Sequence, residues 1–206
     1  STALKVGVLD LNGDVGIQNF VWADATTIAN TKTLTIGGAV DDLVYTGTIA
    51  GDAAGQGTLV VNNSADQANA INFTGAVGST ELAAITLTTD ADFQSTVTAD
   101  AITVASGKIG TFLGDVVVGA ADLTATGTAL FAGTSGQTIT GGAANEEIDG
   151  TGTISVTNAS TAGVTFSTHA TLDANTLDLS ISGTGARAIF QNDANTVEEV
   201  TIGTGA

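Results

Sequence analysis

The sequence predicts an all-β protein, most simply a parallel β-solenoid in which short strands coil into stacked rungs. Apolar residues come in short alternating clusters bounded by Gly, Asn, Asp or Ser, which is the strand pattern rather than the helical one. The 206-residue chain has no proline and only 4% aromatic residues, so its interior must be narrow and filled by small branched side chains. A strand–turn–strand unit also recurs along the chain, as repeat folds require.

The expected strands follow one another closely from one end of the chain to the other. Threonine dominates their outward positions, because its branched Cβ favours the extended chain and its hydroxyl meets water. Helix is expected only in fragments, around 22–29 or 63–70, since Gly and Thr are spread everywhere. The clearest predicted strands lie at 4–11, 34–36, 59–61, 71–73, 85–87, 102–104, 164–166, 177–181 and 197–202.

The recurring unit appears most clearly at 57–77 and again at 152–170. Alignment pairs Leu59 with Ile154, Val61 with Val156 and Phe73 with Phe166. A second similarity pairs 37–49 with 141–154, and it brings an acidic pair in each copy into correspondence; a shorter echo, VEEVTIGTG, lies at 197–205. A chain that reuses one unit in this way is typical of a scaffold.

The central part of the chain has a seven-residue rhythm in Ile102, Ile109, Val116, Leu123 and Leu130. A helical heptad would give the same spacing, but the glycines in this stretch would cost a helix about 1 kcal/mol each. Strand–turn units of seven residues fit better, and three of them make a coil of roughly twenty-one residues, close to one solenoid rung. The glycines are then expected at corners.

A β-sandwich of hairpins, of jelly-roll or immunoglobulin-like type, is the alternative fold, supported by varied strand spacing before residue 100 and by polar turns such as 10–14 and 51–57. Nothing resembling a linker divides the chain, so residues 1–206 are expected to form one elongated domain. Within it, residues 1–32 are a candidate N-terminal cap or assembly region, with Phe20-Val21-Trp22 covering the end of the core.

The net charge is −17, with Lys5, Lys32, Lys108 and Arg187 as the cations. Such a chain would repel a nucleic-acid backbone or an anionic lipid surface, so neither nucleic acid nor membrane insertion is expected. Cysteine and methionine are absent, which suits an oxidising exterior and predicts a secreted protein of the cell surface with a processed N-terminus. The mean hydropathy of +0.33 favours association with identical subunits.

The Gly-Thr-aliphatic unit, followed by phrases such as FTGAVGSTELAAITLTTDADFQSTVTADAITVASG at 73–107, resembles the repetitive passenger regions of bacterial autotransporters and large surface adhesins. This resemblance of style covers residues 33–205. It implies a β-helical structural or adhesive role at the cell surface, and it carries over no functional residue.

Catalytic residue sets are scarce, so no enzyme is expected. The single histidine, His169, lacks a nucleophile in a recognisable motif, and neither a phosphate-binding loop nor a metal-binding His cluster is present. Calcium is the one possible cofactor, because acidic pairs recur along the chain. The Asp10–Asp14 segment resembles half of an EF-hand loop, although a turn explains it as well. The candidate calcium ligands are Asp41, Asp42, Asp90, Asp92, Glu146 and Glu147.

Two functions from different classes follow. In the first, the chain is a self-assembling subunit or segment of a surface layer, fibre or filament, whose terminal strands pair with the next copy. In the second, it is an adhesin or phage-fibre-like module that binds a glycan or a host protein. Phe20, Trp22 and Tyr45 are then the candidate binding residues, since exposed aromatic side chains mark such sites.

Overall fold

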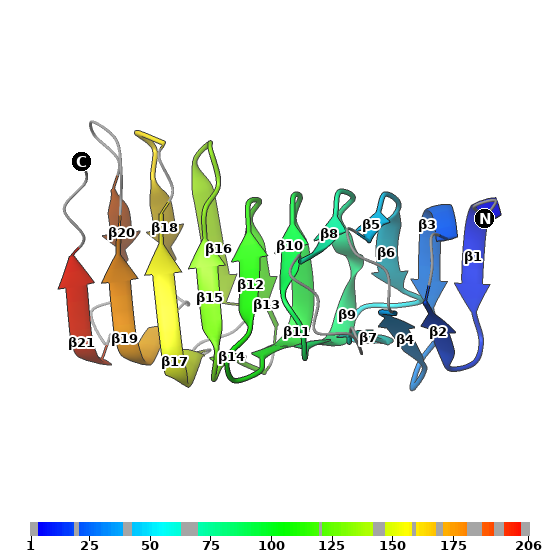
Figure 1. Cartoon of the computed structure of the whole chain (residues 1–206), viewed down its shortest axis with the longest axis horizontal. Helices are drawn as coiled ribbons and strands as arrows, with labels where there is room; N and C mark the ends of the chain where they lie inside the picture. The colour runs from blue at the N-terminus through cyan, green and yellow to red at the C-terminus, as the bar shows by residue number, and fades with distance from the viewer. Residues whose placement is uncertain are drawn as a thin grey trace.

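The computed structural model describes residues 4–18, 21–38, 43–62, 70–119, 121–141, 147–157, 160–167, 171–180, 187–191 and 196–202. These residues form strands and turns with no helix, and the strands stack into a parallel β-solenoid. Figure 1 shows a rod-like stack with β1 at one end and β21 at the other. The predicted fold class is therefore confirmed, and the sandwich alternative is excluded.

The coils stack through three faces, and every pairing between coils is parallel. Face 1 contains β5 (Val44–Tyr45), β8 (Ile71–Phe73), β10 (Ala91–Phe93), β12 (Ile109–Phe112), β15 (Thr128–Phe131) and the C-terminal parts of β17 (Glu147–Val156), β19 (Thr171–Leu179) and β21 (Thr196–Ile202).

Face 2 contains the C-terminal parts of β1 (Leu4–Leu11) and β3 (Val21–Ile28), then β6 (Thr48–Gly51), the N-terminal parts of β9 (Val77–Leu87) and β11 (Val97–Val104), β13 (Val116–Val118), β16 (Gln137–Gly141), β18 (Val164–Phe166) and β20 (Ala188–Phe190). Face 3 contains β2 (Val15–Ile17), β4 (Thr33–Ile36), β7 (Thr58–Val61), the C-terminal parts of β9 and β11, β14 (Leu123–Ala125) and the N-terminal parts of β17, β19 and β21.

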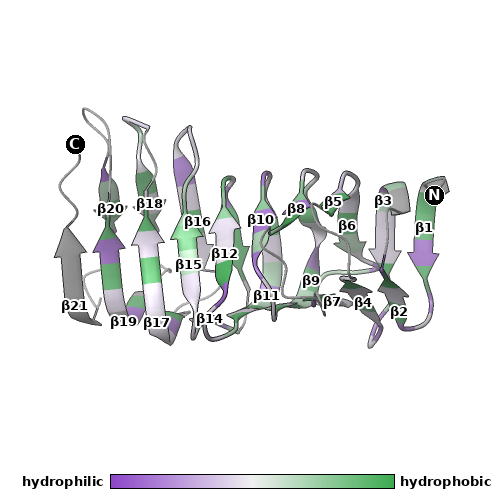
Figure 2. Ribbon diagram, in the orientation of Figure 1, coloured by the Kyte–Doolittle hydropathy of each residue, from purple (hydrophilic) through white to green (hydrophobic). Residues whose placement is uncertain are grey.

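The core is a thin apolar column enclosed by the three faces. Successive side chains of a strand point to opposite sides, so the aliphatic residues of Leu34-Thr35-Ile36 and Ile102-Thr103-Val104 are buried while the threonines between them face outward. Bands of higher and lower hydropathy accordingly alternate along strands such as β17 in Figure 2. The predicted arrangement is therefore confirmed for these strands: branched aliphatic residues fill the core and threonines face outward.

Aromatic rings form a continuous row inside this column. Tyr45, Phe73, Phe93, Phe112 and Phe131 succeed one another on face 1, with ring centroids 6.2, 4.9, 5.4 and 5.6 Å apart. The row then crosses to face 2, because Phe131 meets Phe166 edge to face at 5.6 Å and Phe166 stacks on Phe190 at 4.9 Å. Such contacts add to the stabilisation that the burial of the rings provides.

The seven-residue rhythm is right for part of the central stretch. Ile102 pairs directly with Leu123, one coil later, and both are buried together with Val116. Ile109, however, is 41% exposed, and Leu130 lies outward between the buried Ala129 and Phe131. Coil length is not constant, since Leu4 pairs with Val21 whereas Val44 pairs with Asn72. A fixed spacing of seven residues therefore matches the buried positions for only about one coil.

The two copies of the duplicated unit bury the same positions on different faces. Leu59 and Val61 lie on face 3 and Phe73 on face 1, whereas Ile154 and Val156 lie on face 1 and Phe166 on face 2. The second copy is therefore displaced by one face relative to the first. This displacement explains why the aromatic row crosses between faces beyond Phe131.

The glycine of the Gly-Thr-aliphatic unit lies at corners where two coils approach closely. A Cβ at Gly47 would lie 1.7 Å from the Ala23 carbonyl oxygen, and one at Gly152 would lie 2.0 Å from that of Gly127. The threonine that follows each glycine continues into β6 and into the face 1 part of β17. The close approach of two backbones at a corner therefore requires the glycine of the Gly-Thr-aliphatic unit.

The N-terminal region corrects two expectations. Residues 22–29 are not helical, because all but the last belong to β3, which pairs with β1 and with β6. Trp22 consequently lies in the second coil rather than at the end of the stack, so an end cap at 20–22 is wrong for that position. The second helical prediction, at 63–70, lies outside the described residues except for Ala70, which is not helical.

Candidate functional site

Aspartates at the starts of strands bind the next coil. The Asp14 Oδ1 atom accepts a hydrogen bond from the Thr33 N–H at 2.9 Å, Asp90 Oδ1 accepts one from Ile109 at 2.8 Å, and Asp115 Oδ1 accepts one from Thr138 at 2.7 Å. Each aspartate directly precedes a strand, and each donor lies at the beginning of the strand stacked on it. These carboxylates are therefore structural links between coils.

This role was not predicted from the sequence, although a signal for it was present as Asp followed by an apolar strand residue. A side chain just before a strand lies at the corner of the coil, where its carboxylate can reach a backbone N–H that begins the strand above. Charged acceptors make strong hydrogen bonds to such donors. The recurrence of Asp-Val and Asp-Ala at strand starts was thus a guide to the coil boundaries.

Two of the six predicted calcium ligands, Asp90 and Asp92, lie among the fully described residues. Asp90 serves as the acceptor for Ile109, and Asp92 lies within β10, opposite Asn72 and Thr111 of the neighbouring coils. Asp41, Asp42 and Glu146 lie outside the described residues, and for Glu147 only the backbone is described, within β17. In the described part of the chain, no group of three or more His, Cys, Asp or Glu side chains could hold a metal ion.

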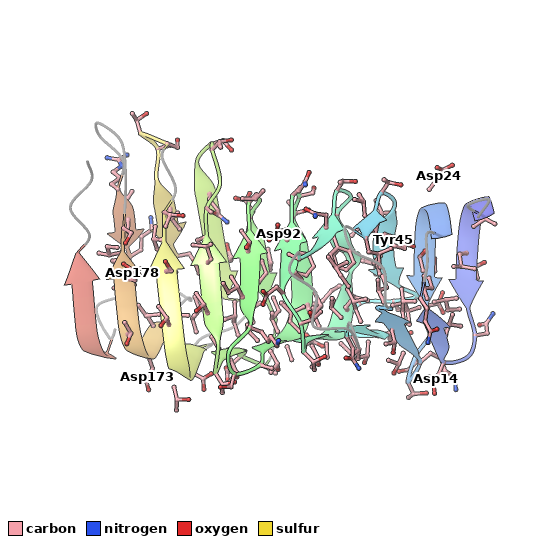
Figure 3. The ribbon with its side chains drawn as sticks, viewed as in Figure 1. Asp14, Asp24, Tyr45, Asp92, Asp173 and Asp178 are labelled. Carbon is pink, nitrogen blue, oxygen red and sulfur yellow. The ribbon has the colours of Figure 1, made fainter. Side chains whose placement is uncertain are left out.

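The predicted EF-hand-like segment is a strand end followed by a turn. Leu11 is buried in the core and Asp14 binds the Thr33 N–H, so the acidic side chains of this segment do not converge. Asp10, Asn12, Thr27 and Asp52 line a shallow hollow of about 230 Å³ at this end of the stack. Figure 3 shows Asp14, Asp24, Asp92, Asp173 and Asp178 spread along the stack rather than around one centre.

One acidic pair does lie on adjacent coils. Asp149 of β17 is in register with Asp173 of β19, and like charges directly opposite each other disfavour strand pairing. The Asp149 Oδ1 atom is buried and has no hydrogen-bond partner among the described residues. Asp178 nearby is satisfied, because its two oxygens accept hydrogen bonds from Ser155 and Ser180 at 3.3 and 2.7 Å.

The aromatic residues predicted to bind a ligand are not gathered on the surface. Tyr45 is only 2% exposed and its hydroxyl forms a hydrogen bond with the buried Thr26 hydroxyl, so its proposal as an exposed binding residue is wrong. Burial raises the pKa of Tyr45, and the hydrogen bond with Thr26 opposes that shift. Phe20 lies outside the described residues, as does the side chain of Trp22; His169 is also outside them.

The two ends of the stack are the distinctive surfaces. Among the described strands, β1 pairs only with β3 and β2 only with β4, while β20 pairs only with β18 and β21 only with β19. The partly buried apolar residues packed on the core lie in these terminal strands or next to them. They are Leu9 in β1 and Val15 in β2 at one end, and Ala188 and Phe190 in β20 and Leu179 in β19 at the other. Among the described residues, each end thus combines a strand edge that has no partner with apolar side chains that are only partly buried.

No protein-family model, curated protein or solved structure matches this chain. Among the described residues there is also no helix that could cross a membrane.

Proposed function

We propose that this chain is a structural protein without catalytic activity, a self-assembling subunit or segment of an extracellular surface layer, fibre or filament. Its partners are identical subunits that stack end to end. The observation that supports the proposal is that, among the described residues, each end of the stack has a strand edge without a partner, with partly buried apolar residues beside it.

Each open edge presents a row of backbone N–H and C=O groups that can pair with another chain, as exposed strand edges do. Natural proteins usually block such edges with proline, with a bulge or with a covering segment. The chain contains no proline, and β1 is an eight-residue strand whose Val8 side chain is 64% exposed. Strand pairing and apolar burial at one joint would therefore reinforce each other.

The surface chemistry supports a scaffold over a catalyst. The described carboxylates with a resolved role link coils or accept hydrogen bonds from serines, as Asp115 and Asp178 do. The resemblance to bacterial surface passengers and the absence of cysteine and methionine favour the cell exterior. An adhesin role gains no support from Tyr45, whose ring is in the core.

Removing a donor from the N-terminal edge tests the proposal more sharply than deleting β1, because deletion would only expose the edge of β3. We expect the wild-type chain to form filaments or sheets in negative-stain images and large species in sedimentation velocity. The variant Val8→Pro should remain monomeric, because proline supplies no N–H to a second chain.

The matched control is Ile109→Thr, which removes from the middle of the stack the other large apolar side chain that is exposed among the described residues, at 41%. This control should assemble like the wild type. A wild-type chain that stays monomeric at high concentration would contradict the proposed function, and so would a Val8→Pro variant that still forms filaments.

A further inference from the structure

We propose that the copies join head to tail, with the β1 and β2 end of one copy stacked on the β20 and β21 end of the next, to give a polar filament. This inference rests on the proposed function and specifies its joint. The two ends of the stack are different surfaces, so three kinds of joint are conceivable: head to tail, head to head and tail to tail.

Continuity of the strand ladder favours the head-to-tail joint. All coils of the chain circulate in one direction and pair in parallel. A head-to-tail joint continues this arrangement, so the inward and outward residues of each face remain aligned across it. In the other two joints one copy is inverted, its chain circulates in the opposite sense, and strands that have only parallel partners within the stack would have to pair antiparallel.

The apolar surfaces of the two ends are also complementary. Phe190 is the last ring of the aromatic row, with Phe166 stacked on one side at 4.9 Å and no described ring on the other. The opposite end of the stack offers the aliphatic side chains of Leu9 and Val15. An aromatic face covered by aliphatic groups buries more apolar area than either end can bury alone.

Charge disfavours the tail-to-tail joint in particular. The terminal strand β21 contains two glutamates, Glu198 and Glu199, and no cation, so a tail-to-tail joint would bring together two strands that each carry a net negative charge. The strand β1 carries Lys5, one of only four cations in the chain. The same strand also carries Asp10, so its net charge is zero, and a head-to-tail joint places the acidic strand against a neutral one rather than against a second acidic strand. Contacts between two different surfaces that do not close a ring generate open filaments.

The test blocks one end at a time. The Leu11 carbonyl accepts a hydrogen bond from the Ala29 N–H, so the backbone groups of Leu11 point toward β3. Because these groups alternate in direction along a strand, the Val8 N–H points toward the opposite edge of β1. At the other end the Gln191 N–H donates to the Phe166 carbonyl, so the Ala188 N–H faces away from β18. Val8→Pro and Ala188→Pro each remove one donor from one open edge and leave the ladder to the neighbouring strand intact.

With each variant carrying a different fluorophore, two-colour sedimentation velocity distinguishes the joints. A head-to-tail joint predicts that each variant alone is monomeric, and that their mixture forms a one-to-one heterodimer through the single unblocked pair of ends. If either variant dimerises alone, like ends associate and the proposal is overturned. If the wild type assembles but the mixture remains monomeric, assembly uses another surface and the proposal also fails.

Failure of the wild type to assemble would instead contradict the proposed function itself, so the two failures are distinguishable. Circular dichroism and thermal unfolding identify a proline variant that does not fold. In that case the same mixing experiment uses Leu9→Lys and Phe190→Lys, which place an ammonium group on the apolar part of each end. These variants are judged by the same outcomes.

Discussion

At the residue scale, the hydrogen bond between Tyr45 and Thr26 is the clearest case of a polar pair enclosed by the core. The two residues are 2% and 1% exposed, and they come from neighbouring coils on β5 and β3. A buried hydroxyl that loses its partner keeps its desolvation cost, whereas the removal of both hydroxyls leaves an apolar contact. The pair therefore positions the first ring of the aromatic row.

We expect Tyr45→Phe to lower the free energy of unfolding by about 1–3 kcal/mol, since it leaves the Thr26 hydroxyl without a partner. Thr26→Val should cost a similar amount for the same reason. The double variant should cost less than the sum of the two, which urea denaturation of all four chains will measure. Strictly additive losses would show that the hydroxyls do not interact.

The raised pKa of Tyr45 adds a dependence on pH. Because the folded chain holds the phenolic proton more tightly, the unfolded chain releases it first as the pH rises through about 10. The stabilisation is present in full below this pH and decreases above it. Unfolding measured between neutral and alkaline pH should therefore show a steeper loss for the wild type than for Tyr45→Phe.

Residue-scale predictions from the sequence succeeded where alternation alone decides the outcome. Leu34, Ile36, Ile102 and Val104 are buried because any extended strand directs every second side chain to one side. Tyr45 was misplaced because an aromatic residue beside Thr and Gly suits a surface as well as a core. Its buried hydroxyl forms a hydrogen bond with Thr26, which lies in another coil, and no local pattern identifies that partner.

At the element scale, the aspartate links show how neighbouring strands are held in register. Asp115 precedes β13 and binds the N–H of Thr138 in β16, which is the strand stacked on it. This hydrogen bond lies at an exposed corner, so its net contribution is expected to be that of an ordinary hydrogen bond. Links of the same kind at Asp14 and Asp90 repeat the arrangement.

Asp115→Ala should lower the free energy of unfolding by about 1 kcal/mol, and Asp115→Asn by less, because the amide oxygen can still accept the Thr138 N–H. Hydrogen exchange provides a local measurement. The Thr138 amide should exchange faster in the alanine variant, while the Thr33 amide, which is bound by Asp14, should serve as an unchanged internal control. Equal exchange at Thr138 in all variants would contradict the link.

Strand existence was predictable from the sequence, but the assignment of strands to faces was not. The period of seven residues placed Ile102 over Leu123 correctly, and it failed at Ile109 because β12 pairs Ile109 with Thr128 rather than with Leu130. Corners of unequal length cause this drift. Among the candidate calcium ligands, Asp90 accepts a hydrogen bond from the Ile109 N–H, and this partner lies in another coil, where no local acidic pattern could have indicated it.

At the scale of the whole molecule, the charge of −17 opposes the stacking of coils. Some carboxylates on successive coils lie close together, as Asp149 and Asp173 do in paired strands. The chain has only four cations to offset its negative charges. Salt screens this repulsion. The same screening should ease the approach of two acidic molecules during assembly.

We expect the melting temperature to rise as NaCl increases from about 0.01 M to about 1 M, a change that shortens the Debye length from about 30 Å to about 3 Å. Thermal unfolding of the dilute, monomeric Val8→Pro variant measures this effect apart from assembly. A melting temperature that stays constant or falls over this range would show that repulsion between carboxylates is not a significant destabilising term.

The displacement of the duplicated unit by one face has a consequence for how such a molecule can lengthen. Leu59 and Ile154 occupy equivalent positions in the two copies of the duplicated unit. Leu59 lies on face 3 and Ile154 on face 1, and both are fully buried. Each face therefore accepts the same alternation of buried aliphatic residues and outward threonines. A duplicated segment therefore need not contain a whole number of coils to be tolerated. The stack can lengthen by the residues of a single face.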